Sequence, residues 1–411
     1  MASIKPFKAL RPQPQLAKQV ASLPYDVLSS AEAKIEAQGN TYTFLHITKS
    51  EIALSDKTDV HAPEVYQQAK DNLDAFIKRD VLFRESKDCY YIYQLIMNGR
   101  SQTGLVCASS VDDYENDIIK KHEFTRPEKE LDRINHIKIT GAQTGNVFLA
   151  YRNNASVDQI IEKWKTTKSA AYDFIAEDGI QHTIWIVSDS EVVEEITRLF
   201  KEEVPCTYIA DGHHRAASAA KVRADLGAKA TPAADYFLTT LFPSNQLYIM
   251  DYNRVIKDLN GLNAEQFLAA LAISFEVSLI GNHAYRPEEL HSLGLYLGGQ
   301  WYKLTAKPGT YSDDPIGVLD VTVLQTQILT PILGIVDQRT DKRIDFVGGI
   351  RGLAALEQRV DSGEMACAFS LYPVTINQLF TIADSGNVMP PKSTWFEPKL
   401  RDGLLTNLIT D

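Results

Sequence analysis

The chain has 411 residues, 44% of them hydrophobic and 23% charged, with a formal net charge of −11. This length supports a large core and two or more packing units, and the composition is that of a soluble globular protein. The negative charge argues against a broad nucleic-acid-binding surface, and no run of about 18 apolar residues predicts a membrane span.

The cysteines and the N-terminus both favour a cytoplasmic protein. No CxxC pair or zinc-site spacing occurs, so we expect reduced and mostly buried thiols at Cys89, Cys107, Cys206 and Cys367. The first residues, "MASIKPFKALRPQPQ", lack the apolar region of a secretory signal.

The predicted elements begin with a proline-punctuated stretch of about thirty residues, which we expect to be extended or turn-like rather than helical. Apolar spacing predicts a helix within 63–82. Residues 87–110 are typical of a β-hairpin whose turn is Asn98-Gly99. A polar, charged segment follows at 112–138.

The second half of the pattern mixes helices and strands. Helices are predicted near 156–167 and 190–203, with a strand at 181–189 between them. A short strand ends in "YIADGHHR", and an alanine-rich helix then runs to Gly227. Residues 234–256 are predicted to form paired strands. Because no regular βαβα rhythm occurs, we expect a mixed α+β fold, divided near 245–260 into regions 1–250 and 251–411.

The stretch "ADGHHR" has the chemistry of an anion-binding turn. The first N–H groups of a helix lack internal partners, and the helix dipole favours negative charge there. Gly212 permits close approach of a ligand, Arg215 can bind phosphate oxygens bidentately, and an imidazolium at His213 or His214 can add a second charged bond. Asp211 would repel phosphate alone, which indicates a bridging Mg²⁺ or a substrate hydroxyl or amine.

This stretch has two alternative interpretations. Asp211 could simply cap the helix, with the neighbouring polar residues solvated. A metalloenzyme is less favoured, because His213 and His214 are adjacent and lack an i+4 partner.

These residues carry a resemblance to known families. "IADGHHR" before an alanine-rich helix resembles the phosphate-binding turn of the ParB/sulfiredoxin-like superfamily, and more closely the V-D-G-H-H-R stretch of archaeal free L-serine kinases. The whole chain is identified as a member of a bacterial family long listed as a domain of unknown function. Its markers are "PFKALRP", "LPYDVLS", "KKHEFT", "ADGHHR" and "MPPKSTWFEPK".

A second motif is His122-Glu123, in a highly charged run. On spacing alone Glu123 is one more solvated charge. The serine kinases carry a similar His-Glu pair, and the resemblance implies that Glu123 takes the proton of the serine hydroxyl, with His122 at the substrate. Thr125 and Arg126 are close enough in sequence to join the same site.

A third motif is "MPPKST". The kinases carry a similar P-K-[ST]-T, so the resemblance implies that Lys392, with Ser393 and Thr394, neutralises a phosphate. Taken alone, the motif is a surface loop.

Two further loops contain polar residues of interest. In "LPYDVLS", Tyr25 and Asp26 could bind a substrate ammonium or a metal, or could form a turn before a helix capped by Ser29 or Ser30. The loop 140–146, "TGAQTGN", is interpreted as a plain turn rather than as part of the site.

The resemblance and the motifs together predict a phosphotransferase that phosphorylates a small metabolite, with free L-serine favoured and O-phospho-L-serine as product. Mg²⁺ is expected, the donor is left open among ATP, ADP and pyrophosphate, and the reaction could run in reverse on phosphoserine. The alternative is a non-catalytic nucleotide- or phosphometabolite-binding sensor. A DNA-associated ParB-like protein is disfavoured by the charge of −11, and neither a nucleic-acid nor a membrane partner is expected; the oligomeric state is left open.

Overall fold

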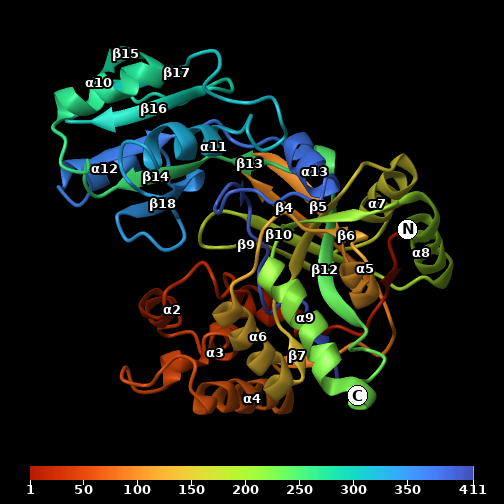
Figure 1. Ribbon diagram of the computed structural model, residues 1–411. Coiled ribbons are helices and arrows are strands. Elements are labelled where there is room, and N and C mark those ends of the chain that lie inside the picture. Colours follow the sequence, from red (N-terminus) through yellow and green to blue (C-terminus); the bar gives the residue numbers. More distant parts are fainter. Residues whose placement is uncertain (411) are drawn as a thin grey trace. The chain divides into compact units, whose positions relative to one another are not determined.

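The computed structural model describes residues 1–410 and divides them into two compact units, whose elements are labelled in Figure 1. The first unit contains Met1–Leu247 and the segment from Pro398 onward, and the second contains Tyr248–Glu397. The expected region 251–411 therefore needs correction at its end. The last segment returns to the first unit because its backbone pairs there: Thr406 with Leu10, Asp402 with Ser22, and β21 (Asn407–Leu408) with β7 (Ala142–Gln143).

A nine-stranded mixed sheet forms the centre of the first unit. Its strand order is β6 (Ile119–Lys120), β11 (Thr207–Asp211), β8 (Val147–Tyr151), β12 (Tyr236–Pro243), β5 (Arg100–Ser110), β4 (Tyr90–Met97), β10 (Gln181–Val187) and β9 (Tyr172–Ile175), with β1 (Ile4–Lys5) paired to β5. The pairs β6–β11 and β8–β12 are parallel, and the other pairs in this sheet are antiparallel. The predicted mixed α+β fold is confirmed.

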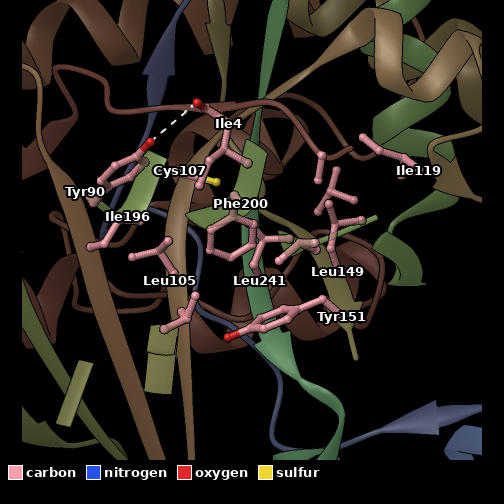
Figure 2. Close-up of a cluster of buried hydrophobic side chains, with 14 of the residues drawn as sticks. Ile4, Tyr90, Leu105, Cys107, Ile119, Leu149, Tyr151, Ile196, Phe200 and Leu241 are labelled. Carbon is pink, nitrogen blue, oxygen red and sulfur yellow. Dashed lines mark hydrogen bonds between the residues drawn. The ribbon is translucent and has the colours of Figure 1, made fainter. Parts of the chain in front are cut away.

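The main core of the first unit lies between this sheet and its helices. Figure 2 shows part of it, where Leu105, Cys107, Leu149 and Leu241 from the sheet meet Phe200 from a helix. The longer helices of the unit are α4 (Pro63–Lys78), α6 (Pro127–Thr140), α7 (Ala155–Thr167), α8 (Ser190–Glu203) and α9 (His213–Leu226). The shorter elements are β2 (Leu10–Pro12), β3 (Leu82–Arg84), α1 (Ala17–Val20), α2 (Ser30–Glu36), α3 (Leu45–Thr48) and α5 (Val111–Glu115).

Several local predictions are confirmed. The hairpin of β4 and β5 turns at Asn98 and Gly99, whose φ angles of 51° and 77° are those of a type I′ turn. The helices predicted near 63–82, 156–167 and 190–203 are α4, α7 and α8. Ser29 caps α2 through a capping box with Glu32.

Two local predictions need correction, and one segment without a predicted element is helical. The proline-rich start contains a helical turn over 14–20, because Pro14 occupies a first helical position, where a missing N–H costs nothing. The charged segment 112–138 contains most of α5 and α6, which bury several of their polar residues, among them Asp113, Glu130 and Arg133. The strands within 234–256 do not pair with one another, since β12 and β14 (Tyr252–Ile256) belong to different sheets.

The second unit is built on an antiparallel sheet of six strands. Their order is β15 (Phe275–Gly281), β17 (Gln300–Ala306), β16 (Ser292–Leu297), β19 (Cys367–Ser370), β14 and β18 (Ile344–Gly348). The unit also contains the pair β13 (Ile249–Met250) and β20 (Trp395–Phe396), and the helices α10 (Ala264–Ser274), α11 (Asp320–Leu324), α12 (Ala354–Asp361) and α13 (Ile376–Asp384). Among the helices of residues 1–410, none combines the length and apolarity needed to cross a membrane.

Candidate phosphate-binding site

The turn between β11 and α9 has the predicted strand-to-helix form. Gly212 adopts a left-handed conformation with φ of 98°, and α9 begins at His213. Gly212 is the N-cap and has no side chain to bond the first N–H groups of the helix. Asp211 is not the cap, so the simple capping interpretation of this stretch is wrong. The first backbone N–H groups of α9, which no side chain caps, and the positive end of the helix dipole therefore lie at this turn.

Sheet order brings two distant motifs to this turn. Strands β6 and β11 are parallel neighbours, so the segments that follow them leave the sheet at the same edge. Strand β8 is antiparallel to β11, with Phe148 opposite Asp211, so the loop that precedes β8 lies at that edge as well. The residues after β6 are the His122-Glu123 motif, and those before β8 are the loop 140–146.

Two histidines of α9 hold the loop that follows β6. The backbone N–H of His122 donates to His213 Nε2 at 3.5 Å, and the two rings meet edge to face with centroids 4.5 Å apart. The backbone N–H of Arg126 donates to His214 Nε2 at 2.9 Å. Glu123, which is half-buried, is therefore carried on a loop fixed at both ends to the first turn of α9.

All three histidines are neutral at pH 7. Burial lowers the pKa of His122 to about 4, and burial together with nearby Lys129 lowers the pKa of His214 to about 4. Burial, reinforced by His122, also holds the pKa of His213 well below its ordinary value. The expected imidazolium is therefore not present in this state, and fixed positive charge must come from other side chains. Both ring nitrogens of His122 are buried without a hydrogen-bond partner among the described residues.

That positive charge comes from two cations around Asp211. Lys399 Nζ lies 2.9 Å from Asp211 Oδ2, and Arg215 Nη2 lies 3.8 Å from Asp211 Oδ1. Burial opposes ionisation of Asp211, but Lys399 and Arg215 outweigh it and hold the pKa of this carboxyl well below its ordinary value. Asp211 is therefore a carboxylate that fixes two cations. Lys399 was not among the predicted site residues, although it ends the marker "MPPKSTWFEPK".

Arg215 is buried at the centre of the site. Its Nη1 donates to the carbonyl of Asn146, and its Nη2 lies 3.3 Å from Asp26 Oδ2. Burial opposes the charge, but Asp26 and Asp211 raise the pKa of Arg215 above its ordinary value. A Cβ on Gly145 would lie 3.3 Å from Arg215 Cδ, so a larger residue there would have to displace the arginine side chain by a few tenths of an ångström. The loop 140–146 thus belongs to the site, and its interpretation as a plain turn is wrong.

Asp402 joins the predicted Tyr25-Asp26 loop to Arg215. Its backbone pairs with Ser22, its carboxylate accepts the N–H of Tyr25, and a Cβ on Gly145 would lie 3.4 Å from its Oδ1. A small cavity of about 30 Å³, enough for ordered water, lies beside this group. The residues that line it include Tyr25, Arg133, Thr144, Gly145 and Arg215. Tyr25 and Asp26 are therefore parts of the same polar cluster as Arg215.

Replacing Asp402 by asparagine is expected to change how stability depends on pH. Burial raises the pKa of the Asp402 carboxyl to about 7, although Arg215 opposes the shift. The folded protein then holds a proton that the unfolded chain releases, so this group lowers stability progressively as pH rises from about 4 to about 7. Asparagine does not titrate, so Asp402→Asn removes this loss of stability at higher pH. Urea unfolding at about pH 5 and pH 7.5 measures the free energy of unfolding. The value for the variant relative to that of the wild type should be larger at the higher pH, whereas an equal difference at both pH values would contradict the assignment.

The remaining predicted residues have contacts of their own. The Thr125 hydroxyl hydrogen-bonds to Glu130, which also pairs with Lys221. Lys392, Ser393 and Thr394 belong to the second unit, where Lys392 has a φ of 60° with its Nζ 5.6 Å from the Tyr252 ring centroid. Their part in phosphate binding stays a prediction.

The chain's own residues do not form a ready metal site. Within residues 1–410, no group of three or more His, Cys, Asp or Glu side chains could hold a metal ion. Asp211, the predicted Mg²⁺ ligand, is occupied by Lys399 and Arg215. Nucleotides commonly bring Mg²⁺ on their own phosphate oxygens and water, so a magnesium requirement does not need a protein cage.

The fold and the site together define a mixed α+β protein whose candidate site is a strand-to-helix turn with two paired cations. The chain belongs to the family described as "Protein of unknown function (DUF1015)", whose model matches residues 4–322. No curated protein matches the chain.

Three solved structures illustrate the similarity. A mutant free serine kinase in complex with AMP is 12% identical, with 74% of this chain and 91% of that chain covered and a TM-score of 0.37. A conserved hypothetical protein from Pyrococcus furiosus is 14% identical, with 74% and 95% covered and a TM-score of 0.36. SbnI from Staphylococcus aureus, truncated at its C-terminus, is 10% identical, with 74% and 87% covered and a TM-score of 0.40.

Proposed function

We propose that this protein is a phosphotransferase acting on the hydroxyl of a small metabolite, with free L-serine as the favoured acceptor. The observation that carries the proposal is the uncapped start of α9, where Asp211 holds Arg215 and Lys399 and two histidines hold the loop of Glu123. A helix N-terminus with fixed cations is suited to a phosphoryl group. The choice of serine rests on the resemblance of the His-Glu and D-G-H-H-R motifs to those of free serine kinases.

The proposed reaction assigns a role to each part. The donor places its transferred phosphoryl group at the N–H groups of His213, His214 and Arg215, where cationic side chains offset its charge. Glu123 accepts the proton of the acceptor hydroxyl, while the oxygen of that hydroxyl forms the new O–P bond. The bond from phosphorus to the donor's bridging oxygen breaks, and the donor leaves with that electron pair. The same steps in reverse would remove phosphate from O-phospho-L-serine.

A direct assay tests the proposal. Purified protein is incubated with L-serine and Mg²⁺, and separately with ATP, ADP or pyrophosphate, and O-phospho-L-serine is measured; the reverse reaction starts from phosphoserine with the matching acceptor. We expect serine-dependent product with at least one donor. Binding of these compounds without turnover in either direction would instead identify the non-catalytic sensor, and no binding at all would exclude both functions.

A further inference from the structure

Lys399 is held at the proposed phosphate site by residues far from it in sequence. Its ammonium lies 2.9 Å from Asp211 Oδ2, directly before the left-handed Gly212 and the start of α9, and its side chain is only 14% exposed. Burying a lysine to this extent requires compensation, which the Asp211 carboxylate supplies. The position of the charge is therefore determined by the fold.

The segment that carries Lys399 is anchored by backbone pairing. Three residues further on, Asp402 and Ser22 exchange two hydrogen bonds of 3.0 and 3.1 Å, and Thr406 and Leu10 exchange two of 2.9 Å. Arg401 N–H also donates to the hydroxyl of Tyr93 at 3.3 Å. Such anchoring fixes a side chain before a ligand arrives, which is the condition for electrostatic stabilisation without reorganisation.

The charge around the turn shows why a second cation matters. Arg215 contributes one positive charge, and its carboxylate neighbours Asp26 and Asp211 contribute two negative ones. The neighbouring histidines are neutral, so without Lys399 these groups would sum to −1 and repel a phosphoryl group. With Lys399 these four side chains sum to zero, so no net negative charge among them opposes the α9 dipole, which favours an anion.

We propose that Lys399 is a phosphate-binding residue, which bridges Asp211 and the phosphoryl oxygens of the donor at the start of α9. The inference rests on the proposed function for the position of the phosphate. An ammonium has three N–H donors, so it can bind both partners at once. The family model ends at residue 322, so the site is completed by a segment outside that match.

The experiment measures binding by the full chain rather than turnover. Titration calorimetry with ADP and with pyrophosphate compares the wild type with Lys399→Met, Lys399→Gln and Lys399→Arg. Lys138→Met is the matched control, because Lys138 forms an exposed ion pair of 2.5 Å with Asp225 in the same unit. We expect Lys399→Met to weaken both dissociation constants at least about tenfold, Lys399→Arg to restore most of that loss, and Lys138→Met to change neither.

The outcomes separate this inference from the proposed function. Lys399→Gln can still donate to Asp211, so it provides a folded variant should the methionine variant fail to fold. Weaker binding in the uncharged variants supports the role of Lys399, even where the wild type forms no phosphoserine and the serine assignment fails. Unchanged binding in both uncharged variants overturns the role of Lys399 and leaves the proposed function standing. A wild type that binds neither compound overturns both.

Discussion

Replacing Arg215 by methionine is expected to lower the free energy of unfolding of the first unit by about 3 to 5 kcal/mol. The guanidinium is buried and lies against Asp26 and Asp211, and it donates to the Asn146 carbonyl. Methionine fills similar space but leaves the partly buried Asp26 and Asp211 and the buried Asp402 without their shared cation. Urea unfolding at about pH 7 measures the loss.

Arg223 on the same helix provides the control. It also pairs with two carboxylates, those of Asp112 and Glu115, but these partners are 68% and 45% exposed. Exposed ion pairs contribute about 0 to 1 kcal/mol, so Arg223→Met should have little effect. Equal losses in the two variants would show that Arg215 is not the central cation of the cluster.

The pH dependence of this loss has a definite sign. In the wild type the pKa of Asp211 is depressed, so its contribution is present above its ordinary pKa of about 4 and is lost only as pH falls further. In Arg215→Met the carboxyl groups of Asp211 and Asp402 lose a cation that lowers their pKa, so the pKa of each should rise. Protonating them removes the uncompensated charge, so the difference between variant and wild type should shrink as pH falls from about 7 to about 5.

The strand-to-helix turn could be predicted because its determinants are local. Gly212 allows the left-handed backbone, the alanine-rich sequence favours the helix, and Gly227 ends it. The Asn98-Gly99 hairpin was predictable for the same reason. In both cases a few adjacent residues determine the backbone, whatever the rest of the chain does.

The partners of the turn could not be predicted in this way. "MPPKSTWFEPK" contains two lysines, and motif resemblance selected Lys392. Lys399 is at Asp211 because the chain re-enters the first unit at Pro398 and pairs with Ser22 and Leu10, which no local pattern encodes. The neutral state of the histidines likewise follows from burial, which only the fold reveals.

Replacing Glu123 by glutamine is expected to lower the turnover number by about 10²- to 10⁴-fold if phosphoserine formation is catalysed as proposed. Glutamine has nearly the same shape but cannot accept the hydroxyl proton. The loop should keep its place, because the backbone N–H groups of His122 and Arg126 hold it to α9. The rate of phosphoserine formation at saturating serine and donor measures the effect.

The control for Glu123 lies five residues further along the chain. Glu128 is exposed in the first turn of α6, so Glu128→Gln should leave the turnover number unchanged. Calorimetry with ADP should give the same dissociation constant for wild type and Glu123→Gln, because the proposed phosphate contacts lie on α9 and at Lys399. Loss of turnover with donor binding retained separates a proton acceptor from a structural residue. A Glu123→Gln variant that turns over at the wild-type rate would contradict the assignment and leave the hydroxyl proton to another group on this loop or to solvent.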